Sequence, residues 1–126
     1  FFRAFCRHIH RNEMALGYAV ELAQRPNLRL GIISNTNAAH ADWLRVLIPE
    51  FQHFKSVILS SDVGLLKPDP AIYHLALSQL EAPPAAALFV DDIGENVEGA
   101  TAVGLHAIHH QDWAITRPAI EEWVKR

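Results

Sequence analysis

The chain has 126 residues, of which 50% are hydrophobic and 20% charged, and its formal net charge is −3. This balance describes one compact soluble domain and excludes collagen-like, disordered and multi-domain chains. The single cysteine, Cys6, excludes an internal disulfide, and the mild acidity provides no basic footprint for nucleic acid or a membrane surface. No apolar run is long enough to span a bilayer and no secretory leader opens the sequence, so we expect a cytoplasmic protein.

The first two predicted elements are helices. Apolar residues recur at helical spacing over residues 1–10, which predicts an amphipathic helix there. Asn12 can cap a second helix that runs through Leu22 and ends at Pro26. Because the sequence begins at Phe1, inside the first helix and without a methionine, we expect a fragment of a longer protein.

Four short apolar runs then predict strands, of which the first fits a strand covered on both faces and the fourth is weaker than the others. These runs are residues 28–33, 57–59, 87–90 and 106–109. Helices are predicted between and after the strands, over residues 38–48, 70–80 with Asp69 as the cap, 95–103 with Gly104 as a left-handed cap, and 116–124 with Thr116 as the cap. Strands that alternate with helices of about ten residues are typical of parallel βαβ units with right-handed crossovers. The predicted fold is therefore an open, doubly wound α/β sheet.

Polar residues follow three of the predicted strands, at the point where each strand ends. Ser34 and Asn35 follow the first strand, Lys67 comes after the second, and Asp91 and Asp92 end the third. In doubly wound sheets, ligands bind outside the carboxyl ends of the strands. A hydroxyl, an amide, an ammonium and two carboxylates at one edge are the groups that a phosphate and a divalent metal require. Hard oxygen ligands suit Mg²⁺, and an ammonium on a flexible stem suits a transferring phosphoryl group.

Each of these features also has a purely structural interpretation. A Ser-Asn pair after a strand is a common turn former, and Lys67 alone is typical of a solvated surface charge. Asp69 fits a helix cap better than a ligand. Two adjacent aspartates are more specific, because the repulsion between close carboxylates usually needs a cation or hydrogen-bond donors to offset it. The combination of all these groups at one sheet edge is what favours a functional site.

Three segments of the chain resemble a known family. The sequences IISN at residues 32–35, GLLKPDPAIY at 64–73 and LFVDDIGENVEGA at 88–100 resemble motifs II, III and IV of the haloacid dehalogenase (HAD) superfamily. The similarity extends over about residues 12–110 and is closest to the branch that contains the phosphatase domain of soluble epoxide hydrolases and sugar-phosphate phosphatases. It implies a HAD-like Rossmannoid core and Mg²⁺-dependent hydrolysis of a phosphomonoester of a small metabolite.

The resemblance also implies a role for each matched residue that faces the phosphate. Ser34 would bind a phosphoryl oxygen through its hydroxyl, and Asn35 would help to orient the substrate. Lys67 would neutralise the charge of the nucleophile and the charge that develops on phosphorus.

The metal-binding roles fall on the third motif. Asp92 would bind Mg²⁺ directly, Asp91 would do so directly or through water, and Asn96 would support these ligands from behind. The aspartate pair favours a metal-dependent phosphatase, because the dehalogenases of the family differ at this motif and use no metal.

Motif I of the family is missing from the sequence. It consists of a strand that ends in Asp-x-Asp and supplies the nucleophilic aspartate, and no two of the six aspartates stand two apart after an apolar run; they are Asp42, Asp62, Asp69, Asp91, Asp92 and Asp112. We therefore expect residues 12–126 to form an incomplete HAD-like core that lacks its central first strand, and residues 1–11 to be a remnant of the helical cap. The flanking strands would then close up, or another chain would fill the gap by self-association. The chain holds no nucleophile, and we expect it to be inactive by itself.

Other classes of function fit the sequence less well. A non-catalytic metal-binding or interaction module of Rossmann-like fold, such as a flavodoxin-like or response-regulator-like domain, is the main alternative. A Ser-His-Asp hydrolase would need a Gly-x-Ser-x-Gly turn, which Ser34 lacks. The histidine pairs His8/His10 and His109/His110 have neither cysteine partners nor the His-Glu-x-x-His spacing of zinc sites, so surface or strand-end positions are expected for them.

Overall fold

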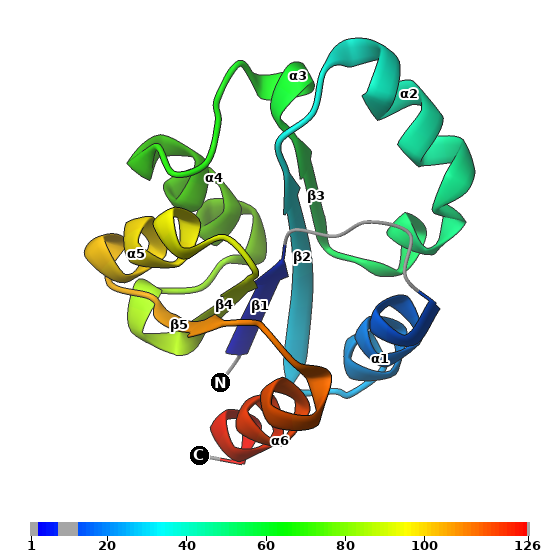
Figure 1. The fold of residues 1–126 in the computed structure, drawn as a ribbon. Coiled ribbons are helices and arrows are strands. Elements are labelled where there is room, and N and C mark those ends of the chain that lie inside the picture. Colours follow the sequence, from blue (N-terminus) through cyan, green and yellow to red (C-terminus); the bar gives the residue numbers. More distant parts are fainter. Residues whose placement is uncertain (1–2, 8–12, 126) are drawn as a thin grey trace.

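The computed structural model describes the backbone of residues 3–7 and 13–14 and the complete residues 15–125. Five parallel strands form one sheet at the centre of the molecule, in the order β3-β2-β1-β4-β5 (Figure 1). The strands are β1 (Arg3–Arg7), β2 (Leu28–Ser34), β3 (Ser56–Leu59), β4 (Ala87–Asp91) and β5 (His106–His109). The helices are α1 (Glu13–Ala23), α2 (Ala38–Leu47), α3 (Ser60–Val63), α4 (Pro70–Leu80), α5 (Gly94–Val103) and α6 (Trp113–Val124), with short 3₁₀ turns η1 (Pro49–His53) and η2 (Pro84–Ala86).

The predicted doubly wound α/β fold is confirmed by the way the helices cover the sheet. Helices α4 and α5 pack on one face, and α1, α2 and α6 contribute to the hydrophobic core of the other face (Figure 1). Strand β4 serves both cores, because Leu88 and Val90 join one and Ala87 and Phe89 join the other. The chain runs outward from β1 to β3 and then crosses to β4, so the topological switch point lies between β1 and β4.

The helix predicted over residues 1–10 is wrong at residues 3–7, which form β1. This strand lies between β2 and β4, with Phe5 paired to both Leu30 and Leu88. A short apolar run fits helical and extended periods alike, and here the hydrogen bonds offered by two neighbouring strands decide the outcome. The remaining residues of the predicted helix lie outside the described part of the chain, and so does Asn12, the predicted cap of the second helix.

Strand β1 also corrects two expectations about the sheet. The sheet was expected to lack its central strand, but β1 occupies that position. Strands β2 and β4 therefore pair with β1, instead of pairing with each other or leaving a gap that another chain could fill. Residues 3–7 are therefore part of the core sheet rather than of a helical cap. Self-association remains a prediction.

Most helix ends agree with the sequence, with one correction at α6. Asp69 caps α4 by accepting a hydrogen bond from Ala71, and Gly104 ends α5 with φ of 107° in the left-handed region. Thr116 was expected to cap the last helix, but α6 begins earlier, at Trp113, with Asp112 as the cap residue. The two residue types are both good N-caps, and Asp112 comes first along the chain. Thr116 is instead buried inside the helix.

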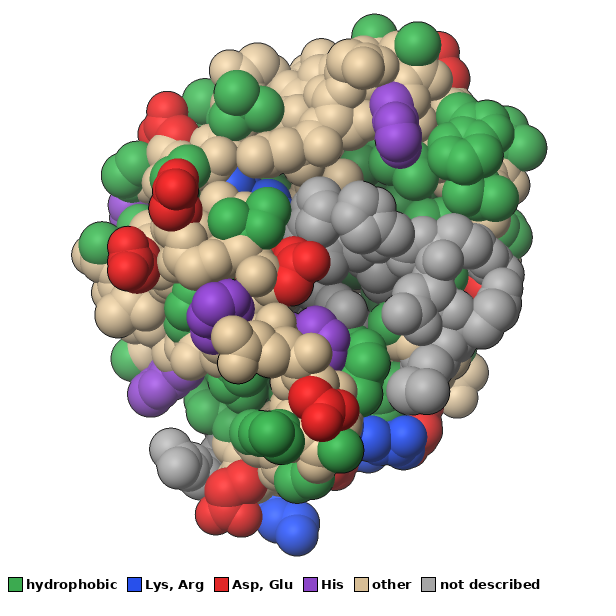
Figure 2. All heavy atoms as spheres, viewed as in Figure 1, with side chains coloured by type: hydrophobic (Ala, Val, Ile, Leu, Met, Phe, Trp, Pro, Cys, Tyr) green, Lys and Arg blue, Asp and Glu red, His purple; other side chains and the backbone are tan. Residues whose placement is uncertain are grey.

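Helix α2 carries two large hydrophobic residues that are exposed. Val46 is 82% exposed and Trp43 is 57% exposed, and hydrophobic side chains gather over this helix at the upper right of Figure 2. The inner face of α2 is held by the buried Ala41 and Leu44. Within residues 13–125, no helix combines the length and apolar content that crossing a bilayer requires.

Two glycines inside helices provide a matched test of the packing. A β-carbon at Gly99 in α5 would lie 2.7 Å from Cβ of Pro68, whereas a β-carbon at Gly17 in α1 would meet nothing within 4 Å. We expect Gly99→Ala to lower the free energy of unfolding by about 1–3 kcal/mol, because the ring of Pro68 cannot give way. Gly17→Ala should raise it by about 0.5–1 kcal/mol through helix propensity. Urea denaturation of both variants measures the difference, and equal effects would contradict the close packing of α5.

Candidate functional site

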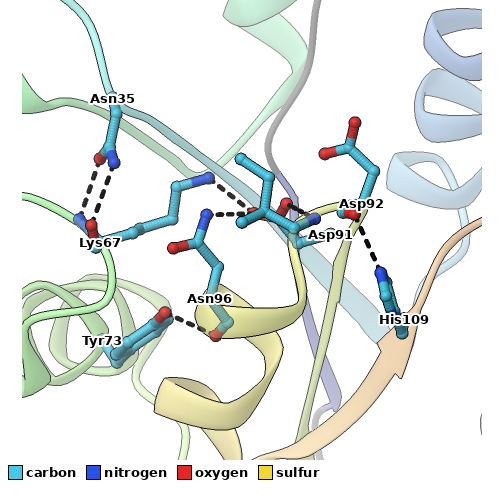
Figure 3. A network of polar contacts seen from close by, with 8 residues as sticks. Asn35, Lys67, Tyr73, Asp91, Asp92, Asn96 and His109 are labelled. Carbon is cyan, nitrogen blue, oxygen red and sulfur yellow. Dashed lines mark hydrogen bonds and ion pairs between the residues drawn. The ribbon is translucent and has the colours of Figure 1, made fainter.

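The predicted polar residues gather at the carboxyl edge of the sheet. Ser34 is the last residue of β2 and Asp91 the last of β4, and β1 lies between these strands. Neighbouring strands lie about 4.8 Å apart, so the ends of β2 and β4 are roughly 10 Å apart. Lys67 reaches this edge from the loop before α4, and its side chain points toward Asp91 (Figure 3).

A buried ion pair between Lys67 and Asp91 forms the centre of the site. Lys67 Nζ lies 2.7 Å from Asp91 Oδ2, and both side chains are 0% exposed. Asn96 Nδ2 also donates to Oδ2 at 3.3 Å, and the backbone N–H of Ile93 donates to Oδ1 at 2.9 Å. Both oxygens of the carboxylate are therefore satisfied by groups that favour its charged form.

Burial and the hydrogen-bond and charge partners of Asp91 shift its pKa in opposite directions. Burial alone would raise the pKa of this carboxyl, but the positive charge of Lys67, with the hydrogen bonds from Lys67 and Ile93, outweighs it and holds the pKa below its ordinary value. Asp91 is consequently ionised at neutral pH and keeps the Lys67 ammonium oriented.

Asn35 fixes the main chain of Lys67. Its Oδ1 accepts a hydrogen bond from Lys67 N at 2.9 Å, and its Nδ2 donates to Lys67 O at 3.1 Å (Figure 3). The family resemblance assigns Asn35 to orienting the substrate, whereas in this structure its amide binds the loop that carries the lysine. The ring of Phe89 lies on the other side, with its centroid 5.7 Å from Lys67 Nζ.

Ser34 is buried at the end of β2, with 3% of its surface exposed. Its hydroxyl makes no hydrogen bond to any residue in the described part of the chain. The hydroxyl of Ser60 nearby differs, because it accepts from Thr36 N at 2.6 Å and donates to Thr36 O at 2.8 Å. An unsatisfied buried hydroxyl has a cost that a bound oxyanion would remove.

Asp92 directly follows Asp91, the last residue of β4. It is exposed, and its carboxylate points away from the Lys67–Asp91 pair (Figure 3). Its carbonyl oxygen accepts a hydrogen bond from His109 Nε2 at 2.9 Å, and the carbonyl of Asp91 accepts from the backbone N–H of His110 at 2.8 Å. The end of β5 thus fixes the turn that carries both aspartates. Nowhere in the described residues do three or more His, Cys, Asp or Glu side chains converge into a metal-binding group.

Comparison with known proteins assigns the chain to a family. A model of haloacid dehalogenase-like hydrolases matches residues 12–104. The chain belongs to this hydrolase family. One relative is the rat bifunctional epoxide hydrolase 2, which is 38% identical over 71 residues; these are 56% of this chain and 13% of that enzyme. Another is phosphatase MT3486 of Mycobacterium tuberculosis, which is 32% identical over 90 residues; these are 71% of this chain and 42% of that phosphatase. The chain therefore spans less than half the length of either relative.

Solved structures confirm the HAD-like fold. An uncharacterized protein from Corynebacterium glutamicum superposes with a TM-score of 0.84 at 21% identity, covering 99% of this chain and 96% of that one. A HAD family enzyme from Bacteroides thetaiotaomicron, in complex with magnesium and inorganic phosphate, superposes with a TM-score of 0.68 at 22% identity, over 82% of this chain and 56% of the enzyme.

Sequence analysis assigns no role at the site to three of its contributors, although Tyr73 and Phe89 fall within the matched segments 64–73 and 88–100. Tyr73 lies in the apolar stripe of α4, Phe89 in the apolar run of β4, and His109 at a strand end. Their residue types predict a core or surface position, and only the packing of α4, β4 and β5 against one another places them around the ion pair.

The ion pair predicts a pH dependence that depends on Lys67. Lys67→Met would leave Asp91 buried without its cation and should lower the free energy of unfolding at about pH 7 by about 3–5 kcal/mol. In the unchanged protein, the lowered pKa means that the stabilisation by Asp91 is present at neutral pH and is lost as the pH falls below the ordinary value of 3.8. In the variant, burial dominates and raises this pKa, so its stability should instead rise as the pH falls toward about 4. Urea denaturation across this pH range, giving parallel curves for the two proteins, would contradict the pairing.

Proposed function

We propose that this chain forms the phosphate- and metal-binding half of a Mg²⁺-dependent phosphatase that hydrolyses the phosphomonoester of a small metabolite. The observation that carries the proposal is the buried Lys67–Asp91 pair at the same carboxyl edge of the sheet as Ser34, a buried residue whose hydroxyl makes no hydrogen bond within the described part of the chain. Membership of a hydrolase family and the similarity to phosphatase MT3486 support it.

Each residue has a defined part in this proposal. Asp91 keeps Lys67 ionised, and the lysine offsets the negative charge of the phosphoryl oxygens. The Ser34 hydroxyl donates a hydrogen bond to one of these oxygens. Asn35 holds the loop of Lys67 against the end of β2 through two hydrogen bonds to the backbone of the lysine. Groups that are fixed before the ligand arrives lose little entropy when they bind it.

Mg²⁺ fits the same edge through Asp92. This carboxylate is exposed and points away from the Lys67–Asp91 pair (Figure 3), whereas both oxygens of Asp91 already accept hydrogen bonds. Mg²⁺ typically takes only one or two protein carboxylates and keeps several waters, so Asp92 as the direct ligand, with Asp91 behind it or joined through water, is sufficient. The bound ion would supply positive charge to the phosphoryl oxygens. The magnesium and inorganic phosphate named for the Bacteroides thetaiotaomicron enzyme support this choice.

The chain contains no candidate for the nucleophile of this chemistry. Its first aspartate is Asp42, and the sequence that follows β1 reads His8-Ile9-His10 where the family carries Asp-x-Asp. No aspartyl-phosphate can therefore form on that segment. A second candidate function, a non-catalytic phosphate- or metal-binding module, is favoured by the histidines that follow the central strand β1 in place of those aspartates.

A measurement of phosphatase activity distinguishes the two proposed functions, neither of which includes catalysis by this chain alone, from an active enzyme. We expect the pure 126-residue chain to hydrolyse no p-nitrophenyl phosphate above the buffer rate, with or without Mg²⁺, because it lacks the attacking carboxylate. Hydrolysis that requires Mg²⁺ and disappears in Lys67→Ala would show that the nucleophile has been misassigned.

Phosphate binding tests the proposed site directly. We expect inorganic phosphate to bind the chain in the presence of Mg²⁺, and Ser34→Ala to weaken this binding about tenfold, the effect of losing one hydrogen bond to a charged ligand. The same substitution should not lower the free energy of unfolding, because the hydroxyl has no partner among the described residues. Isothermal titration calorimetry and urea denaturation measure the two effects.

Ser56→Ala is the matched control. Ser56 is also 3% exposed, but its hydroxyl donates a hydrogen bond to the side chain of Gln79 in α4. It is the first residue of β3 and so lies at the end of the strand away from the proposed site. This variant should lose stability and keep its phosphate affinity. Asp92→Asn should remove the Mg²⁺ dependence of phosphate binding without unfolding the protein, whereas Asp42→Asn on the exposed surface of α2 should not. Equal phosphate affinities in Ser34→Ala, Asp92→Asn and the unchanged chain would refute the proposed site.

A further inference from the structure

We propose that Tyr73 is a positioning residue that sets the geometry of the Lys67–Asp91 ion pair from the interior side of the site. The contribution of Tyr73 to phosphate binding rests on the proposed function, whereas its effect on the ion pair does not. Tyr73 makes no hydrogen bond to either charged group. It acts on them through two residues that it contacts, Asn96 and Phe89.

The two partners of the ion pair belong to different structural units. Lys67 lies in the loop that leads directly into α4, and Tyr73 is in the first turn of that helix. Asp91 ends β4, and its donors Ile93 and Asn96 lie at the start of α5. The distance between the ammonium and the carboxylate therefore depends on how α4 is held against β4 and α5.

Tyr73 joins these two units through a buried hydrogen bond. Its side chain is 0% exposed, and its hydroxyl donates to the carbonyl oxygen of Asn96 at 2.7 Å (Figure 3). The side chain of the same Asn96 donates to Asp91. A shift of Tyr73 would thus move the backbone of the residue that fixes the carboxylate.

The ring of Tyr73 provides a second connection, to the lysine. It packs edge-on against Phe89, with ring centroids 5.3 Å apart and an angle of 86° between the planes. The face of Phe89 in turn lies 5.7 Å from Lys67 Nζ. Tyr73 therefore supports the aromatic ring beside the ammonium as well as the amide that binds the carboxylate.

At Gly99, α5 packs closely against Pro68 and Tyr73. A β-carbon at Gly99 would lie 2.7 Å from Pro68 Cβ and 3.2 Å from Tyr73 Cε2, so α5 packs directly on the residue that follows Lys67. Burial, together with the negative charge of Asp91, raises the pKa of Tyr73, and its hydroxyl remains a donor at neutral pH. The hydroxyl and the close glycine contact fix the same helix at two neighbouring points.

Tyr73→Phe tests this role, with Tyr18→Phe as the matched control. The substitution keeps the ring and removes only the hydroxyl. Tyr18, the other tyrosine of the chain, is also buried and donates its hydroxyl to Glu121, but it belongs to the core on the opposite face of the sheet. Both variants lose one hydrogen bond of a buried tyrosine, so a general loss of stability would affect them alike.

The readout is the side-chain ¹⁵N–¹H spectrum of the lysine ammonium groups. The chain has three lysines, and Lys55 and Lys125 are exposed, so only Lys67 should give a signal protected from exchange with water, with a coupling across its hydrogen bond to Asp91. We expect Tyr73→Phe to lose this coupling and Tyr18→Phe to retain it. An unchanged coupling in Tyr73→Phe would overturn the proposal, and so would a Tyr73→Phe protein that does not fold, because the hydroxyl would then determine folding rather than the ion pair.

Phosphate titration in the presence of Mg²⁺ tests the functional consequence. We expect Tyr73→Phe to bind inorganic phosphate about tenfold more weakly than the unchanged chain, and Tyr18→Phe to bind it equally well. If the unchanged chain binds no phosphate, the proposed function fails while the ammonium spectrum still decides the role of Tyr73. Equal affinities in all three proteins, with binding present, would overturn the functional part of the inference.

Discussion

Lys67 and Asp91 can be buried only as a pair, and the site is arranged around that constraint. Removing a charge from water costs several kcal/mol, which a partner at 2.7 Å offsets only when the remaining donors and acceptors are also satisfied. Asn96 and Ile93 meet this requirement for the carboxylate, and Asn35 fixes the main chain of the lysine. The result is a charged group that is oriented before any ligand arrives, which is the property that recognition of an oxyanion needs.

The sequence predicts those parts of the fold that have a local signature. Strands β2 to β5 coincide with apolar runs, and Asp69 and Gly104 mark helix ends through their own backbone chemistry. Strand β1 has no such signature, because five residues cannot distinguish a helical from an extended pattern. Its conformation is decided by β2 and β4, which lie far along the chain and offer hydrogen bonds on both sides.

The same division holds for the site. Ser34, Asp91 and Asp92 could be predicted to lie at one edge of the sheet, because parallel strands deliver their carboxyl ends there. The hydrogen bonds that orient them could not. Asn35 binds the backbone of a residue 32 positions away, and Tyr73 reads as an ordinary core residue until α4 is packed against α5. Sequence patterns therefore indicate which chemical groups gather, and tertiary packing decides which of them contact one another.

The position of β1 also constrains how the molecule assembles on the ribosome. Ala4 pairs on one side with Arg29, which is synthesised soon afterwards, and on the other side with Ala87, which emerges much later. Until β4 is available, one edge of the central strand has no partner, and a bare strand edge is a site of unwanted pairing with other chains. The nascent chain must therefore carry this exposed edge until residues 87–91 have been synthesised, and burial of the Lys67 charge must wait for the same strand.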